Sequence, residues 1–191
     1  MNGKILLIVD PQYDFINGSL EVNGAEEAMD KLADFIKQNG SDYDNIIITA
    51  DWHPQSHCSF KQNGGIWPIH CVQHSHGAAI YQPIFNALNE IKSNYIVLTK
   101  GVDEDHEEYS IFKNQKSCAS ISIICDTLKI NSIDVCGLAF DYCVADSVKD
   151  GLRELPNVSF KVFKELSPEI GKETADEFIK FINNSERVDL V

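Results

Sequence analysis

Asp51 and His53 stand two residues apart in this sequence, and His70 follows further along the same polar stretch. A spacing of two in an extended chain puts both side chains on one side, and a returning loop would bring His70 back to complete a triangle. Two imidazoles and a carboxylate suit Zn²⁺, Fe²⁺ or Mn²⁺ with coordination positions left open. An Asp-x-His pair is a weak signal by itself, and solvated loop histidines beside a helix-capping aspartate are the alternative. That alternative also holds for the other histidines of the stretch, which are His57, His74 and His76.

Asp10 and Lys100 each come directly after a short apolar run, at 4–9 and 95–99 respectively. If these runs are parallel strands, both side chains lie at the carboxyl edge of the sheet, where substrates bind. Burial there would raise the pKa of Asp10 toward that of a useful general base. A lysine enclosed beside this carboxylate would stay charged and would lower the pKa of a nearby thiol. The alternatives are a capping or turn aspartate and a lysine at the surface.

Cys143 lies in the turn 137–144, between an apolar run that ends at Cys136 and a helix expected to start near Tyr142. The positive end of a helix dipole and unpaired N–H groups favour a thiolate, and the same N–H groups can stabilise an oxyanion. A thiol, a carboxylate and a lysine supply the nucleophile, base and orienting charge for acyl transfer through a covalent thioester. The other cysteines have no CxxC spacing, and we expect them to be free, small, buried side chains. They are Cys58, Cys71, Cys118, Cys125 and Cys136.

The elements that must position these side chains are apolar, β-branched runs alternating with helical patterns. The runs expected as strands are 4–9, 45–50, 95–99, 132–136, 158–163 and 187–191. The segments expected as helices are 24–38, 82–91, 118–128, 144–155 and 172–182. This alternation predicts the α/β class, with a parallel sheet covered by helices on both faces, in a single domain spanning residues 1–191. The connections 51–80 and 100–115 are longer than this architecture needs, which is typical of ligand-binding loops.

The charge balance argues against polyanionic partners. The chain has 16 Lys and Arg against 29 Asp and Glu, a formal net charge of −13. The basic residues are scattered singly, so we expect neither nucleic acid nor an anionic membrane as a partner. No stretch approaches the roughly 18 apolar residues of a membrane span, and no signal-peptide core is recognised, so we expect a cytoplasmic protein. Most carboxylates, including the run 103–108, are expected to be solvated.

The order of these motifs resembles one known family. Asp10 is followed by Asp51-Trp-His53-Pro, Trp67-Pro-x-His70-Cys-Val, Lys100-Gly, Tyr109-Ser-x-Phe112 and Gly137-x-Ala-x-Asp-Tyr-Cys143-Val. The series covers nearly the whole chain and is similar to the nicotinamidase, or pyrazinamidase, branch of the isochorismatase-like cysteine hydrolase superfamily. The Asp, Lys and Cys indicate only the superfamily, whereas the DWHP and WPxHCV segments are specific to its metal-binding branch.

The resemblance implies a three-layer α/β/α sandwich with a six-stranded parallel sheet. It also implies an amidohydrolase that converts nicotinamide to nicotinate and ammonia in NAD salvage and accepts pyrazinamide as well. In such enzymes, Asp10 would take the thiol proton of Cys143 and pass it to the leaving ammonia, while Lys100 positions and polarises the pair. The thiolate attacks the carboxamide, and the N–H groups of Ala139 and Cys143 receive the oxyanion, with the peptide between Leu138 and Ala139 expected to be cis. Water then hydrolyses the thioester.

The resemblance further implies one divalent metal ion, held by Asp51, His53 and His70, that binds the pyridine nitrogen. Zinc is the expected ion, and iron and manganese are the alternatives. Some relatives use a further histidine, which would be His57, whereas others complete the coordination with water. The aromatic side chains expected to sandwich the ring are Phe15, Trp67 and Tyr109.

Two positions depart from the family pattern. Phe140 stands where many relatives have Thr, and Glu108 stands where Ser is common. Neither position supplies a group to the implied mechanism, so we expect altered packing around the site and not a loss of activity.

Three other functions are weighed against this one. Another amidase of the superfamily, acting on a carbamoyl or pyrazine substrate, is the nearest, and the metal set argues against the metal-free branches. An Fe²⁺ oxygenase with two histidines and one carboxylate would normally be an all-β barrel, which the alternating pattern does not support. A non-catalytic scaffold would have lost the nucleophile or the base. The expected partner is therefore a small molecule, nicotinamide, and the sequence leaves homo-oligomerisation and the preference between substrates open.

Overall fold

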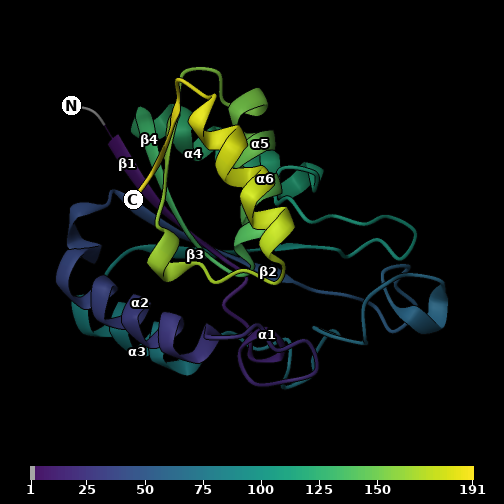
Figure 1. Cartoon of the computed structure of the whole chain (residues 1–191). Helices are drawn as coiled ribbons and strands as arrows, with labels where there is room; N and C mark the ends of the chain where they lie inside the picture. Colours follow the sequence, from purple (N-terminus) through teal and green to yellow (C-terminus); the bar gives the residue numbers. More distant parts are fainter. Residues whose placement is uncertain (1–2) are drawn as a thin grey trace.

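Six parallel strands form one sheet, in the order β3-β2-β1-β4-β5-β6. The structure, a computed structural model, describes residues 3–191. The strands are β1 (Gly3–Val9), β2 (Asn45–Asp51), β3 (Tyr95–Lys100), β4 (Ile130–Gly137), β5 (Ser159–Val162) and β6 (Val188–Leu190). The chain builds outward from β1 to β3 and then crosses back to β4, on the other side of β1 (Figure 1). In open sheets of this kind, ligands bind at the reversal, outside the carboxyl ends of the strands.

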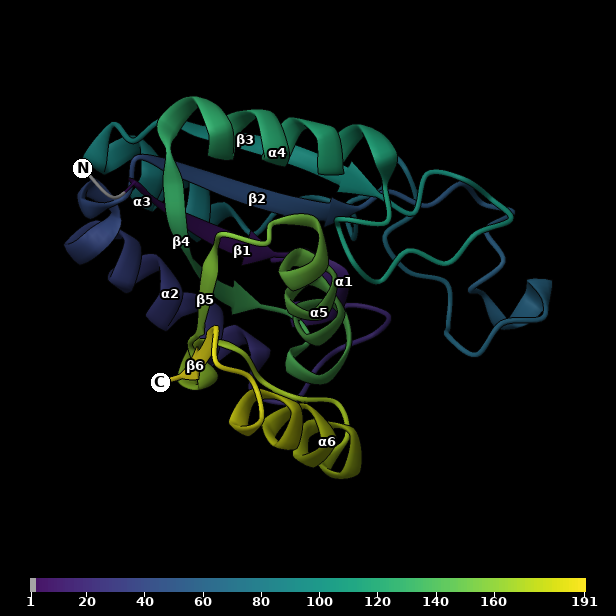
Figure 2. The same cartoon turned by 90° about the horizontal axis from the view of Figure 1, so that it is seen from above.

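Helices cover both faces of the sheet, as Figures 1 and 2 show. One face carries α2 (Ala25–Asn39) and α3 (Gln82–Ile91), and a short helix, α1 (Tyr13–Ile16), follows β1. The other face carries α4 (Gln115–Leu128), α5 (Ala145–Glu154) and α6 (Lys172–Asn183). The predicted three-layer α/β/α architecture is therefore confirmed. No helix within residues 3–191 is both long enough and apolar enough to cross a bilayer.

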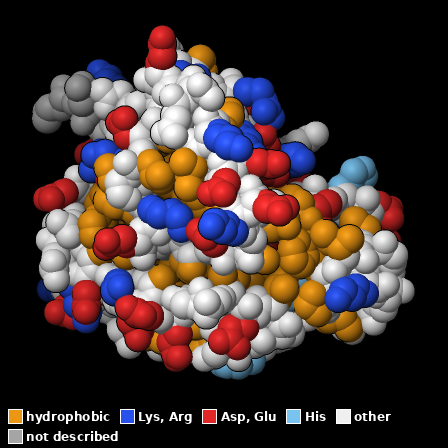
Figure 3. All heavy atoms as spheres, viewed as in Figure 1, with side chains coloured by type: hydrophobic (Ala, Val, Ile, Leu, Met, Phe, Trp, Pro, Cys, Tyr) orange, Lys and Arg blue, Asp and Glu red, His pale blue; other side chains and the backbone are white. Residues whose placement is uncertain are grey.

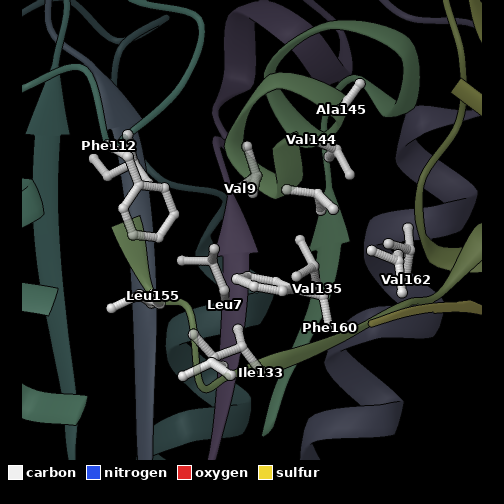
Figure 4. Close-up of a cluster of buried hydrophobic side chains, with 14 of the residues drawn as sticks. Leu7, Val9, Phe112, Ile133, Val135, Val144, Ala145, Leu155, Phe160 and Val162 are labelled. Carbon is white, nitrogen blue, oxygen red and sulfur yellow. The ribbon is translucent and has the colours of Figure 1, made fainter. Parts of the chain in front are cut away.

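Alternate residues of the central strand feed two apolar cores. Leu6 and Ile8 of β1 pack toward α2 and α3, whereas Leu7 and Val9 pack toward α4, α5 and α6. Figure 4 shows part of the second core, in which Leu7 and Val9 lie beside side chains of β4 and β5. Because both faces of each inner strand are covered, the strands read as near-continuous apolar runs and not as an alternation.

The starts of α4 and α5 differ from the prediction for reasons that the structure explains, whereas α2 differs by a single residue. α4 starts at Gln115, three residues before the expected 118, because the side chain of Asn114 caps it by accepting the Ser117 N–H at 3.2 Å. Asparagine is a favoured N-cap residue, so this cap explains the longer helix. α5 starts at Ala145, and a π-helical turn, Phe140–Val144, precedes it. Cys143 therefore lies in this wide turn and not in the first turn of a regular α-helix.

Charged side chains are spread over the surface. Figure 3 shows acidic and basic groups interspersed with apolar ones over one face. On α2, Lys31 lies 2.8 Å from Glu27, and Lys37 lies 3.0 Å from Asp34. Exposed pairs of this kind contribute only about 0–1 kcal/mol each, so the fold depends on its two cores.

Gly137 ends β4 with a φ of +118°, and a Cβ at this position would lie 2.1 Å from the carbonyl oxygen of Val9. We expect Gly137→Ala to lower the free energy of unfolding by more than about 2 kcal/mol, because backbone strain and a backbone clash act together. Gly64→Ala is the control, since Gly64 has a φ of +94° but its Cβ would meet no described atom within 4 Å. Urea unfolding measures both variants, and equal losses would contradict the close approach of β1 and β4.

Candidate active site

Four of the predicted residues meet at the carboxyl edge of the sheet. Asp10 directly follows β1, Asp51 ends β2, Lys100 ends β3, and Cys143 lies in the turn after β4. Asp51 and Lys100 are also paired in the β2–β3 ladder. All four side chains are buried. Four strand ends that are remote in sequence thus place a thiol, two carboxylates and an amine in one volume.

The Lys100 ammonium lies at the centre of this cluster. Its Nζ is 2.9 Å from Asp10 Oδ2, 2.5 Å from Asp51 Oδ1 and 3.5 Å from Cys143 Sγ. Burial by itself would lower the pKa of Lys100, but the two carboxylates outweigh it and hold this pKa well above its ordinary value. Lys100 is therefore a fixed positive charge.

Asp10 is held in a left-handed conformation, with a φ of +46°. Its Oδ1 accepts the Thr49 hydroxyl at 2.6 Å, and its N–H donates to the same hydroxyl oxygen at 3.2 Å. Its Oδ2 faces the Lys100 ammonium at 2.9 Å and has no other partner among the described residues. Carboxylate oxygens of Asp10 and Asp51 and the Sγ of Cys143 lie within 4.8 Å of one another. Strained backbone of this kind is typical of functional sites, and here it leaves a carboxylate oxygen able to accept a proton beside the thiol.

Burial controls the protonation of the thiol. It raises the pKa of Cys143 well above the ordinary value, although the charge of Lys100 opposes this shift. Burial also raises the pKa of Asp10, again against Lys100. The sequence favoured a thiolate, but desolvation outweighs the charge of Lys100, so the neutral thiol is favoured in this environment.

The turn before Cys143 contains a cis peptide bond between Leu138 and Ala139, as the resemblance implied. The Ala139 carbonyl accepts the N–H groups of Tyr142 and Val144, at 3.2 and 3.1 Å. The Ala139 N–H donates no hydrogen bond to any described residue. Ala139 and Cys143 both line the same pocket.

The predicted metal ligands come together as well. Ligand atoms of Asp51, His53 and His70 lie within 4.8 Å of one another, and all three side chains are buried. The Nδ1–H of His53 donates to the Gly101 carbonyl at 2.9 Å, and that of His70 donates to the Pro68 carbonyl at 2.8 Å. These bonds leave Nε2 of each ring without a backbone partner, which is the usual arrangement of metal-ligating histidines, and Nε2 of His53 faces the third ligand, Asp51. The donor set therefore fits a divalent ion.

Two of the three ligands carry the charge that such a site needs. At His53, burial would lower the pKa, but Asp51 outweighs it and raises the pKa, so a metal ion would have to displace a proton from this ring. Burial by itself would raise the pKa of Asp51, but Lys100 and then His53 outweigh it and hold the Asp51 carboxyl ionised. Burial lowers the pKa of His70, which favours the neutral imidazole that a metal requires. Asp51 directs Oδ1 to Lys100, while its Oδ2 lies 3.5 Å from His53 Nε2.

His57 does not join this set in the structure. Its ring centroid lies 4.0 Å from that of His53, but its Nδ1 accepts from the Ser59 hydroxyl at 2.7 Å, and its Nε2–H donates to the His106 carbonyl at 3.1 Å. Both ring nitrogens are therefore occupied. Burial and the charge of His53 lower the pKa of His57 to about 4, so the ring stays neutral. The two remaining histidines of the stretch pack on aromatic rings, His74 on Trp52 and His76 on Tyr13.

The three predicted aromatic residues line a narrow pocket above Cys143. Trp67 and Tyr109 come from the two long connections, which project together beyond β2 and β3 in Figures 1 and 2. The Trp67 indole N–H donates to the Tyr109 hydroxyl at 2.9 Å and so joins the connections. Phe15 comes from α1 and lies 5.5 Å from the His70 ring. The full lining is Phe15, Leu20, Asp51, Trp67, His70, Glu107, Tyr109, Ala139, Tyr142, Cys143 and Ile170.

The acidic run 103–108 contains two carboxylates of this region, of which the sequence singled out only Glu108, as a departure from the family pattern. Glu107 lines the pocket, and burial, followed by the charge of Asp51, raises its pKa. Glu108 is only 9% exposed, and it accepts the Gly101 N–H at 2.7 Å and an Asn114 side-chain N–H at 3.1 Å. The expectation that the whole run 103–108 is solvated is therefore wrong at these two positions. A signal was available in the sequence, because the run lies between Lys100 and Tyr109, two residues that were already predicted to belong to the site.

Comparison with known proteins supports the assignment that the site suggests, although no family model matches the chain. A nicotinamidase of Escherichia coli (strain K12) is 33% identical over 175 residues, covering 80% of this chain and 78% of that relative. The crystal structure of the pyrazinamidase of Pyrococcus horikoshii in complex with zinc superposes with a TM-score of 0.82 at 25% identity, covering 98% of both chains. The structure of PnC1 from L. infantum in complex with nicotinate superposes with a TM-score of 0.85 at 28% identity, covering 100% of this chain and 92% of the other. On this identity and coverage, and with the predicted fold in place, the chain belongs to the nicotinamidase family.

Proposed function

We propose that this chain is an amidohydrolase that converts nicotinamide to nicotinate and ammonia, and that it hydrolyses pyrazinamide by the same route. The observation that carries the proposal is the buried cluster of Cys143, Asp10 and Lys100, which opens onto an aromatic pocket that also holds the metal donor set. Membership of the nicotinamidase family and the nicotinate complex of a relative support this choice of substrate.

In the first half of the reaction, Asp10 takes the proton from the Cys143 thiol as Sγ attacks the carboxamide carbon. The charge of Lys100 stabilises the ionised pair. The N–H groups of Ala139 and Cys143 donate hydrogen bonds to the oxyanion that forms. When the C–N bond breaks, the leaving nitrogen takes the proton held by Asp10 and departs as ammonia, which leaves a thioester on Cys143.

In the second half, a water molecule attacks the thioester carbon while Asp10 removes one of its protons. The same N–H groups hold the second oxyanion. The C–S bond breaks, the Cys143 sulfur recovers the proton from Asp10, and the product carboxyl group gives its remaining proton to solvent and leaves as nicotinate. Asp10 thus moves one proton in each half-reaction, which needs a pKa closer to neutrality than that of an exposed aspartate.

We assign the metal site to Asp51, His53 and His70, with zinc as the expected ion. When bound, the ion supplies a Lewis acid for the pyridine nitrogen, and this fixes the ring without touching the scissile amide. The zinc complex of the archaeal relative and the grouping of these donor atoms support the assignment. Phe15, Trp67 and Tyr109 would hold the two faces of the ring.

The wider setting follows the family resemblance. We propose that the activity serves NAD salvage in the cytoplasm and that residues 1–191 form one hydrolase domain. The one sheet and its two helical layers take in every long element of residues 3–191, which supports a single domain.

Replacement of the nucleophile tests the activity directly. We expect Cys143→Ala to abolish ammonia release from nicotinamide and pyrazinamide, and Asp10→Asn to lower kcat/KM by roughly 10²–10⁴-fold, because the base is lost. Cys125→Ala is the matched control, since Cys125 is also a buried free thiol but lies in α4, away from the pocket. A folded, zinc-loaded wild-type protein that leaves both amides intact would overturn the proposed function.

The pH profile tests the assignment of the base. Burial raises the pKa of Asp10, so the carboxylate is lost as pH falls through a value above the ordinary 3.8. We therefore expect kcat/KM to decline in acid with an apparent pKa above 3.8, while circular dichroism shows that the chain is still folded. Full activity persisting down to pH 3.8 would contradict this role for Asp10.

Removal of the metal tests the anchoring of the ring. We expect a chelator to abolish nicotinate binding in calorimetry and added zinc to restore it. We also expect His70→Ala to weaken zinc binding by more than about 100-fold, beyond what the loss of an outer hydrogen-bond partner costs. His76→Ala is the control, because His76 stacks on Tyr13 outside the donor set. Nicotinate binding that survives complete removal of the metal would refute this role.

A further inference from the structure

Gln12 is completely buried, and its carboxamide makes three hydrogen bonds, all to backbone groups. The Asp51 N–H donates to Gln12 Oε1 at 2.8 Å, and Gln12 Nε2 donates back to the Asp51 carbonyl at 2.8 Å. The second Nε2–H donates to the Ala78 carbonyl at 2.9 Å. Both donors of the amide are thus satisfied by groups at the two ends of the long connection 51–80.

The end of β1 explains why a side chain is needed here. The β1–β2 ladder runs only to the pair Ile8 and Ile48, and Asp10 then turns away with a φ of +46°. On this side, Asp51 therefore has no β1 backbone to pair with. A primary amide presents its C=O and one N–H side by side, as the C=O and N–H of a single residue in an extended strand are presented, so Gln12 can replace the missing strand partner. On its other side, Asp51 pairs with Lys100 of β3.

The same residue closes the base of the connection that carries both metal-ligating histidines. Gln12 forms an antiparallel bridge with Ile80, and the Tyr13 N–H donates to the Ala79 carbonyl at 3.1 Å. Together with the bond to Ala78, these contacts hold the end of the connection beside its start at Asp51. These contacts therefore set the distance between Asp51, at the end of β2, and residues 78–80, where the connection ends.

We propose that Gln12 is a positioning residue for the metal and catalytic centre. By holding both backbone groups of Asp51, it orients the carboxylate so that one oxygen faces Lys100 and the other faces the histidine ligands. Gln12 is absent from the pocket lining, so it acts through the backbone groups that it holds, two of which belong to Asp51. The inference rests on the proposed function for the identity of the metal site. It predicts that a variant without these hydrogen bonds binds the metal more weakly than a variant that is equally destabilised by a change elsewhere in the fold.

Zinc affinity, measured by competition with a fluorescent chelator, tests this without any assay of activity. Gln12→Met keeps the length of the side chain but removes all three hydrogen bonds, and we expect it to weaken zinc binding by about 10–100-fold, as the loss of other orienting partners does. Gln12→Asn retains the amide but is one methylene too short to reach both backbone groups, so the same direction is expected if Gln12→Met does not fold. Leu88→Ala is the control for stability, because Leu88 is equally buried but lies in α3.

A double-mutant cycle shows whether the effect passes through Asp51. On an Asp51→Asn background, we expect Gln12→Met to change zinc affinity by less than about threefold, since the ligand that it orients is already altered. The full 10–100-fold effect persisting on that background would overturn the inference. The inference would also be overturned if Gln12→Met and Gln12→Asn bound zinc with the same affinity as Leu88→Ala. Failure of the wild-type chain to bind zinc would instead overturn the metal site of the proposed function, and this inference with it.

Discussion

The ion cluster around Lys100 is the interaction on which the rest of the site depends. A buried ammonium costs several kcal/mol of desolvation unless it is paired, and here Asp10 and Asp51 both lie within 2.9 Å of its Nζ. Two carboxylates against one ammonium leave the cluster with an excess negative charge, and ionisation of Cys143 would add another. This excess negative charge favours the neutral thiol of Cys143, and a carboxylate oxygen of Asp10 lies within 4.8 Å of its sulfur.

Asp51 connects the two halves of the site. One of its oxygens is committed to Lys100, and the other lies beside His53, so the catalytic cluster and the metal donor set share one carboxylate. A carboxylate with two such partners tolerates little rotation, which explains why its backbone is held on both sides, by Lys100 of β3 and by Gln12. The pairing of β2 with β3 fixes the position of Asp51 on one side, and the buried amide of Gln12 holds it on the other side, where β1 has already ended.

The fold was largely predictable from two patterns. Strands that are covered on both faces are apolar almost throughout, and the helices between them have an apolar stripe on one side. The misplaced boundaries have local causes. The cap by Asn114 lengthens α4 at its start, and the π-helical turn around Cys143 delays α5. Polar residues at the ends of predicted strands also placed the candidate site, since parallel strands bring their carboxyl ends to one edge.

The sequence by itself determined which chemical groups are present and at which strand ends they stand. Only the tertiary structure decided their states and their partners. Burial raises the pKa of the Cys143 thiol, against the thiolate that the sequence favoured. Both ring nitrogens of His57 have hydrogen-bond partners outside the donor set. Glu107 lines the pocket and Glu108 is buried, although the run that contains them was expected to be solvated. The physical reason is that desolvation and hydrogen-bond partners depend on distances between residues far apart in the chain. Those distances are set by strand register and by the path of the long connections, neither of which a local pattern encodes.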